Sequence, residues 1–294
     1  AALGERPHAT FSGIEPNPSF ETSMKAVAQI REGGFDFLLA VGGGSVIDAV
    51  KFIAAAVRFE GDDPWAILEK HGRNVKGAMP FGAVLTLPAT GSEMNNGGVV
   101  TRKATQAKLA FSSSHCFPQF SVLDPTKTYT LPREQIANGI ADAFVHTMEQ
   151  YLTYPVQALA QDRFAEGLLQ TLIEIAPGAL AETPDYDNRA NLMWTATLAL
   201  NGLIGAGVPQ DWATHMIGHE LTALHGIDHA GTHATAGGAT RDDRCINPTL
   251  QQPTRQACLK ECGSRLLTNH PFTPQGLELR HDLRGIRLFC EFLQ

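Results

Sequence analysis

Apolar and polar positions follow two different rhythms along the first 132 residues. Short, almost wholly apolar runs are separated by longer segments in which apolar residues recur every three to four positions. The first rhythm is typical of parallel strands covered on both faces, and the second is typical of amphipathic helices. The strand-like runs cover residues 35–41, 82–87 and 120–123. The helical segments cover residues 20–32 and 46–57. The alternation predicts an α/β domain with a largely parallel sheet, to which Val99–Arg102 and Lys108–Phe111 add a hairpin.

The pattern changes after Leu131-Pro132. Only helical periodicity follows, over residues 134–152, 157–177, 187–204 and 210–224. We therefore place a domain boundary near residue 132, which gives an α/β domain over 1–132 and an all-helical domain over 133–230. Residues 231–294 contain scattered Gly, Pro, Arg and Cys without sustained periodicity. They predict an atypical, poorly ordered tail.

Composition and charge narrow the class of protein. The chain has 294 residues, 43% hydrophobic and 18% charged, which is enough to form packed cores. The net charge is −7 and no basic stripe is present, so we expect no nucleic-acid partner. No apolar run reaches the roughly 18–20 residues that span a bilayer, and the first residues lack a signal-peptide pattern. We therefore expect a cytoplasmic protein that does not enter a membrane.

The five cysteines do not indicate a disulfide framework, because their number is odd and their spacing is not paired. Cys258 and Cys262 are four residues apart, which is compatible with metal binding. No second pair of ligands follows at finger-like spacing, so two ordinary thiols are the favoured interpretation.

A glycine-rich turn stands between the first strand-like run and the second helix. Gly42-Gly43-Gly44 lets the backbone come close to a pyrophosphate, and the following helix N-terminus offers amide groups and a positive dipole end. Ser45 is the expected N-cap and Asp48 is expected in the first turn. The match to G-x-G-x-x-G is partial, because Ile47 occupies the third glycine position. A plain strand-to-helix turn remains the alternative.

Carboxylate and imidazole side chains are concentrated in the helical domain. Asp142 and His146 are four residues apart, which places both on one face of a helix. Five of the 11 histidines then lie within 19 residues: His215, His219, His225, His229 and His233. Imidazole with carboxylate suits zinc or iron(II), and an open coordination position makes such a site catalytic. For Asp142 and His146 alone, a surface pair is the favoured interpretation; for the second group, a helix with several surface histidines remains the alternative.

Six segments together resemble the iron-containing alcohol dehydrogenases, and within them the NADPH-dependent aldehyde reductases and butanol dehydrogenases. They are Gly13–Pro18, Phe37–Ala56, Leu85–Asn95, Val122–Pro132, Asn138–Thr153 and Gly205–Ala230. The resemblance implies a Rossmann-like dinucleotide-binding domain, then a helical domain, with the active site between them. It implies a metal-dependent, NAD(P)H-linked oxidoreductase that interconverts aldehydes and primary alcohols by hydride transfer. The metal would act as a Lewis acid on the substrate oxygen.

The resemblance also assigns roles to individual residues. The metal ligands would be Asp142, His146, His215 and His229. His219 or His225 would relay a proton. The pyrophosphate would be bound by Gly42, Gly43, Gly44, Ser45 and Asp48. The nicotinamide and phosphate end would be bound by Thr86, Thr90 and Lys108. Zinc and iron(II) both suit the ligands, NADP(H) is expected rather than NAD(H), and the family suggests a homodimer with a small aldehyde or alcohol as substrate.

Two features depart from the family. Its members begin with a strand and a glycine-rich turn that contribute to binding the adenosine half of the cofactor, and few residues precede Gly13 here. We expect this unit to be missing and one sheet edge to be exposed, which predicts poor solubility. The match ends near Ala230, which indicates a frameshift or a wrong join. The alternative function is an inactive, truncated remnant that at most binds a divalent metal.

Overall fold

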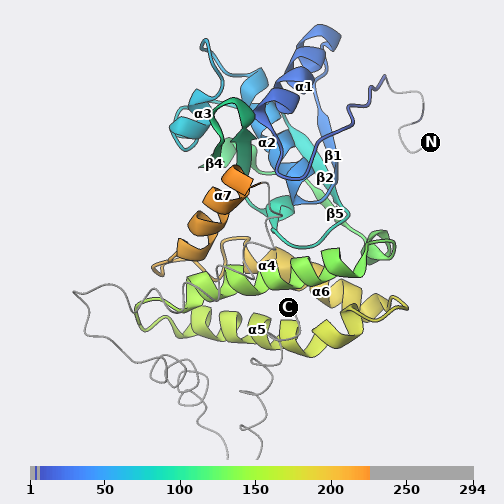
Figure 1. Cartoon of the computed structure of the whole chain (residues 1–294), viewed down its shortest axis with the longest axis vertical. Helices are drawn as coiled ribbons and strands as arrows, with labels where there is room; N and C mark the ends of the chain where they lie inside the picture. Colours follow the sequence, from blue (N-terminus) through green and yellow to red (C-terminus); the bar gives the residue numbers. More distant parts are fainter. Residues whose placement is uncertain (1–3, 5–6, 226–294) are drawn as a thin grey trace, which may run out of the picture.

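The computed structural model describes residue 4 and residues 7–225. It has an α/β part followed by a helical part (Figure 1). The five strands are β1 (Leu38–Gly42), β2 (Phe81–Leu85), β3 (Gly97–Arg102), β4 (Ala107–Ser112) and β5 (Ser121–Leu123). The α-helices are α1 (Phe20–Gly33), α2 (Gly44–Val57), α3 (Ala66–Glu69), α4 (Arg133–Tyr151), α5 (Leu159–Ala179), α6 (Tyr186–Ala199) and α7 (Ala213–His225). Four short 3₁₀ turns are η1 (Ser92–Met94), η2 (Lys103–Thr105), η3 (Ser114–Cys116) and η4 (Pro125–Thr128). The predicted tail over 231–294 lies outside the described residues.

The main sheet is parallel, as the sequence pattern predicts. Its strand order is β1-β2-β5, with Leu38 opposite Phe81 and Leu85 opposite Leu123. The strands β3 and β4 form a separate antiparallel hairpin. Because parallel strands end at one edge, the segments after Gly42, Leu85 and Leu123 begin side by side. Ligands of open parallel α/β sheets bind at this carboxyl edge.

One face of the parallel sheet is buried and the other is open. Helix α2 packs on β1 and α1 packs on α2, so Ala40 and Ala83 are buried. On the opposite face, Leu39, Val41 and Val122 are 42%, 58% and 45% exposed. The expectation that both faces are covered is therefore wrong for the part of the chain that the structure describes, because no described element packs on this face. On the edge away from β2, β1 has no strand neighbour among the described residues.

Helix α2 is almost wholly buried, and even its lysine is enclosed. The Lys51 ammonium group donates to Ser92 Oγ at 2.8 Å, to Asn95 Oδ1 at 2.7 Å and to the Gly97 carbonyl at 2.6 Å. Burying a charge is costly unless it is paired and hydrogen-bonded, and these contacts supply its acceptors. They fix α2 to η1 and to the start of β3.

The helical part begins directly after Pro132, where α4 starts. Helices α4, α5 and α6 pack against one another around a core of their own, to which α4 contributes Ile136, Ile140, Ala143 and Phe144. This spacing of i, i+4, i+7 and i+8 is that of one helix face. A separate core lies around α2 and the sheet. The two cores support the domain division near residue 132, which stays a prediction.

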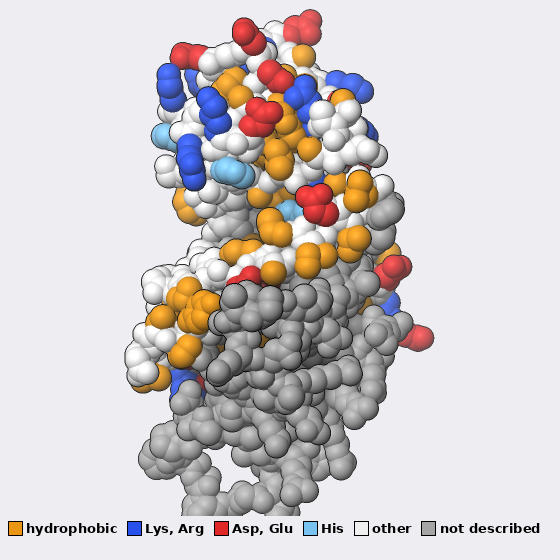
Figure 2. Space-filling view, turned by 60° about the vertical axis from the view of Figure 1, so that its left-hand side comes forward, with side chains coloured by type: hydrophobic (Ala, Val, Ile, Leu, Met, Phe, Trp, Pro, Cys, Tyr) orange, Lys and Arg blue, Asp and Glu red, His pale blue; other side chains and the backbone are white. Residues whose placement is uncertain are grey.

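Helix α7 stands apart from the other helices. It lies beside β4 at one side and α4 at the other, as Figure 1 shows in orange. Figure 2 shows the molecule turned so that the left-hand side of Figure 1 comes forward. On this face, charged side chains gather over the α/β part and hydrophobic side chains over the middle of the molecule. Among the described helices, none combines the length and the apolar character needed to cross a membrane.

A loop after β2, residues 86–91, packs between the two parts. A Cβ added to Gly44 would lie 2.4 Å from Thr90 Oγ1, and one added to Gly139 of α4 would lie 2.2 Å from the Pro88 carbonyl oxygen. Gly91 has φ +59°, and a Cβ there would lie 3.2 Å from the Ala196 carbonyl oxygen of α6. The loop therefore contacts α2, α4 and α6 where only glycine leaves room.

Replacing Gly139 with alanine tests this close approach. The added Cβ would meet a backbone oxygen, which cannot rotate away as a side chain can. We expect Gly139→Ala to lower the free energy of unfolding by about 1–3 kcal/mol. The control is Gly167→Ala in α5, where a Cβ meets nothing within 4 Å. It should raise stability by about 0.5–1 kcal/mol. Chemical denaturation followed by circular dichroism measures both, and equal effects would contradict the packing described.

Candidate active site

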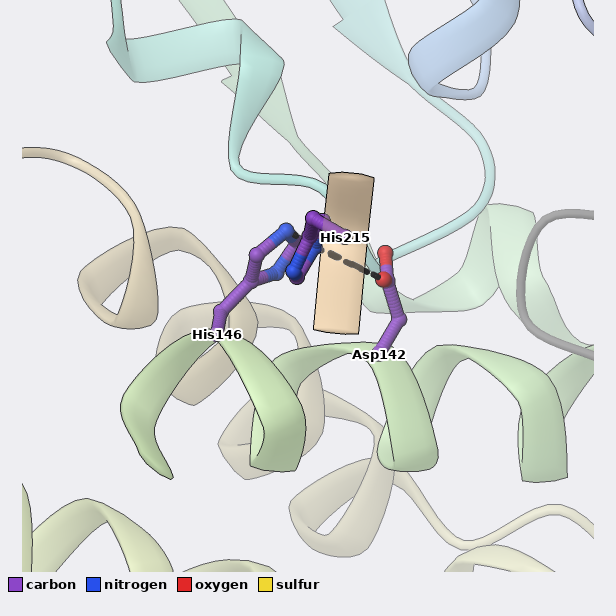
Figure 3. Close-up of side chains that lie close together, drawn as sticks. All are labelled: Asp142, His146 and His215. Atoms are coloured by element: carbon purple, nitrogen blue, oxygen red, sulfur yellow. Dashed lines mark ion pairs between the residues drawn. The ribbon is translucent and has the colours of Figure 1, made fainter. Parts of the chain in front are cut away.

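Three of the predicted metal ligands come together in the structure. Asp142 and His146 lie one turn apart on α4, and His215 reaches them from the first turn of α7 (Figure 3). All three are buried, at 2%, 3% and 6% exposure. Ligand atoms of the three residues lie within 4.8 Å of one another. The alternative of surface histidines is therefore wrong for His146 and His215.

The distances and the chemistry of these side chains fit a divalent cation. The Nε2 atoms of His146 and His215 lie 3.8 and 3.9 Å from Asp142 Oδ1, which is too long for a hydrogen bond. In a tetrahedral site with bonds of about 2.1 Å, neighbouring ligand atoms are about 3.4 Å apart. A small shift of the side chains would therefore suit such a cation.

His146 is held in the neutral form that a metal ligand requires. Burial lowers the pKa of its imidazole to about 3, because no charged form can be solvated there. Its Nδ1 atom is buried and has no hydrogen-bond partner among the described residues. Two imidazoles and one carboxylate form a nitrogen and oxygen donor set that fits zinc or iron(II).

The rings of the two buried histidines and of Trp212 pack together. His146 and His215 are stacked with centroids 4.5 Å apart, and Trp212 meets the His215 ring edge-on at 5.2 Å. His219, one turn further along α7, is also buried, with its ring centroid 6.4 Å from that of His215. His219 is thus beside the cluster, and its role in proton relay stays a prediction.

Two predicted histidines cannot be placed. The backbone of His225 ends α7, but its side chain lies outside the part that the structure describes. His229, the expected fourth ligand, lies beyond the described residues altogether. The roles of both residues stay predictions.

Glu149 is a residue of this site that the sequence analysis missed. It lies on α4 at i+7 from Asp142, on the same helix face, and its Oε2 contacts His215 Nδ1. Its Oε1 accepts from the Thr214 amide at 2.5 Å. Burial raises the pKa of the Glu149 carboxyl to about 7, which the hydrogen bonds from Thr214 and His215 oppose. The sequence signal that could have revealed Glu149 was an acid at i+7 from Asp142, which shares the helix face of Asp142 and His146.

The glycine turn follows β1 at the carboxyl edge of the sheet, as expected. The N-cap of α2 is Gly43, whereas Ser45 was predicted, so Ser45 lies in the first turn of the helix. A Cβ on Gly43 would lie 3.0 Å from Leu87 Cβ, and Gly44 approaches Thr90 more closely still. Packing therefore leaves little room for a side chain at Gly43, and none at Gly44 unless Thr90 shifts. The amides at the α2 N-terminus remain available to a phosphate.

Two of the remaining predicted cofactor residues lie beside this turn, and the third, Lys108, lies on β4. The amide of Thr86 donates to the Gly42 carbonyl at 3.0 Å, and Thr90 Oγ1 accepts from the Ser92 amide at 3.3 Å. Lys108 Nζ donates to Asn17 Oδ1 at 2.8 Å. These contacts place Thr86 and Thr90 beside the turn.

Asp48 differs from its predicted position. It lies beyond the first turn of α2, and its carboxylate accepts from Ser92 Oγ at 2.6 Å and from the Val99 amide at 2.9 Å. Burial raises the pKa of Asp48, which the positive charges of Lys51 and Lys108 oppose. Both carboxylate oxygens thus bind the protein, and a direct contact of Asp48 with a pyrophosphate stays a prediction.

Two family models and the sequences of known proteins match most of this chain. The model of the family "Iron-containing alcohol dehydrogenase" matches residues 2–125, and that of its C-terminal domain matches residues 136–238. The chain is 65% identical over 225 residues to NADPH-dependent aldehyde reductase YqhD of Escherichia coli, covering 76% of this chain and 58% of the relative. It is 46% identical over 221 residues to probable NADH-dependent butanol dehydrogenase 1 of Bacillus subtilis, covering 75% and 57%. The chain thus spans somewhat under three fifths of the length of these relatives.

Solved structures share the fold. The crystal structure of Escherichia coli YqhD has a TM-score of 0.85 and 52% identity, covering 99% of this chain and 72% of that chain. NADH-dependent butanol dehydrogenase A of Thermotoga maritima has a TM-score of 0.78 and 34% identity, covering 96% and 68%. The chain has a Rossmann-like α/β part and a helical part, and each is matched by one of the two family models. This chain belongs to the iron-containing alcohol dehydrogenase family.

Proposed function

We propose that the protein is a metal-dependent, NAD(P)H-linked oxidoreductase that interconverts aldehydes and primary alcohols by hydride transfer. The observation that carries this proposal is the buried cluster of Asp142, His146 and His215, joined to the glycine turn through residues 86–91. The names of the relatives, an aldehyde reductase and a butanol dehydrogenase, support it.

The cluster supplies the residues that would hold a divalent cation. Asp142, His146 and His215 are three ligands, and His229 is the fourth in our proposal. The bound cation supplies Lewis-acid polarisation of the substrate oxygen. Burial keeps His146 neutral, and the Trp212 ring packs edge-on against the His215 ring at one side of the cluster. Zinc and iron(II) both match this donor set.

The glycine turn and its neighbours would hold the cofactor. The amides at the N-terminus of α2 bind the pyrophosphate, and Thr86, Thr90 and Lys108 contact the nicotinamide and phosphate end. NADP(H) is favoured because the relative with 65% identity is named as NADPH-dependent. His219 lies beside His215, with ring centroids 6.4 Å apart, and is the first candidate for a proton relay toward the site; His225 is the second.

Removing the cation ligands should abolish turnover. We expect the wild-type chain, supplied with zinc or iron(II), to oxidise NADPH in the presence of an aldehyde. Asp142→Ala combined with His215→Ala should lower the rate on the order of a thousandfold or more, because polarisation by a cation contributes several kcal/mol. His115→Ala, an exposed histidine in η3, is the control and should keep the wild-type rate.

The assay needs metal content measured on the same samples. Wild-type protein that is folded, holds one equivalent of cation and still shows no turnover would contradict the proposal. It would instead favour a remnant that binds metal only.

A carboxylate at the start of α2 should block the cofactor without weakening the fold. In Ser45→Asp, the new charge suits the positive end of the helix dipole but repels a pyrophosphate. Like charges a few ångströms apart near a protein surface cost on the order of several kcal/mol, so we expect at least about tenfold weaker NADPH binding. Ser45→Asn, of nearly equal size and uncharged, is the matched control. Fluorescence titration with NADPH measures both, and equal affinities would place the pyrophosphate elsewhere.

A further inference from the structure

One face of α4 carries three polar side chains directed at α7. Asp142, His146 and Glu149 follow one another at i, i+4 and i+7, and all three are buried. The first two are candidate cation ligands. Glu149 does not point at the same space, because its two oxygens contact His215 and the Thr214 amide. The mechanism proposed above assigns no role to this carboxylate.

The two contacts of Glu149 have different consequences. The contact with the Thr214 amide satisfies one of the backbone donors that a helix N-terminus leaves open. The Asp211 carboxylate accepts from the neighbouring Ala213 amide at 3.1 Å, so two acids cap the start of α7. Negative charge at this end also suits the helix dipole.

The second contact fixes the chemical form of His215. In its ionised form Glu149 can only accept hydrogen bonds, so the His215 Nδ1 atom beside it then carries a proton. In a neutral imidazole, Nε2 then has the free lone pair. That atom lies 3.9 Å from Asp142 Oδ1, on the side of the cluster. Hydrogen-bonded carboxylates orient histidine ligands of metal centres in this way.

We propose that Glu149 is a positioning residue, which holds His215 in the Nδ1–H form with Nε2 toward the cation and caps α7 at the same time. The cation part of this inference rests on the proposed function. The tautomer and the capping do not depend on it. One side chain thereby joins the docking of α7 on α4 to the assembly of the ligand set.

The variant Glu149→Gln separates the two roles. A glutamine has one accepting oxygen and one donating nitrogen. Its oxygen can still accept from the Thr214 amide, so the cap on α7 is kept. Its amide nitrogen then faces His215 and favours an accepting Nδ1, which moves the proton to Nε2. Glu166→Gln is the matched control, since Glu166 is a partly buried acid of α5 that accepts from Tyr151 at 3.0 Å, away from the cluster.

Two measurements test the proposal on the full chain. Nitrogen NMR of ¹⁵N-histidine-labelled, metal-free protein reports which nitrogen of His215 is protonated, with assignment through His215→Ala. Cobalt(II) titration followed by absorption reports cation affinity. We expect Glu149→Gln to convert His215 to the Nε2–H form and to weaken cobalt(II) binding roughly 10- to 100-fold, with an unchanged unfolding midpoint. Glu166→Gln should leave the tautomer and the affinity unchanged.

The outcomes discriminate between the proposals. An unchanged His215 tautomer in Glu149→Gln would overturn the positioning role, whatever the metal result. An altered tautomer with unchanged cobalt(II) affinity would overturn the link between Glu149 and the cation. If wild-type protein failed to bind cobalt(II), the proposed metal function would be wrong, whereas the tautomer measurement would still decide the positioning role.

Discussion

The close packing of residues 86–91 is the constraint on which both halves of the candidate site depend. Thr90 lies against Gly44, where α2 begins, and the Pro88 carbonyl lies against Gly139 of α4. Gly139 is less than one turn from Asp142, so a single loop sets the position of the glycine turn relative to the candidate cation ligands. Because protein interiors are close-packed, neither helix can shift without moving this loop.

Buried charges hold the same loop from its far end. Glu93, just after the loop, accepts from Thr197 Oγ1 of α6 at 2.5 Å, while Lys51 of α2 donates to Ser92 and Asn95. Burial raises the pKa of Glu93 and lowers the pKa of Lys51 to about 8, so both groups depend on their protein partners. A polar network of this kind is costly unless fully bonded, and here it links α2, η1 and α6 into one unit.

Helix and strand positions could largely be predicted from the periodicity, because burial on one face of an element leaves a local pattern. Element ends could not. The segment predicted as helical to residue 204 ends as α6 at Ala199. The next carbonyl, that of Leu200, accepts from Asn95 Nδ2 at 3.2 Å, a contact between residues 105 apart in the chain. Similarly, the apolar runs predicted a sheet covered on both faces, but they contain no information about which element covers each face.

The sequence by itself determined the candidate ligand pair on α4 and the family pattern of the glycine turn. Asp142 and His146 share a face because a helix repeats every 3.6 residues, which is a local property. The family resemblance named His215 as their partner, but only the tertiary structure decided that His215 lies beside them, that Glu149 faces His215, and that Asp48 binds Ser92 and Val99. These contacts join segments 44 to 73 residues apart. Each therefore depends on how separate elements pack, and the order of residues within one element does not reveal it.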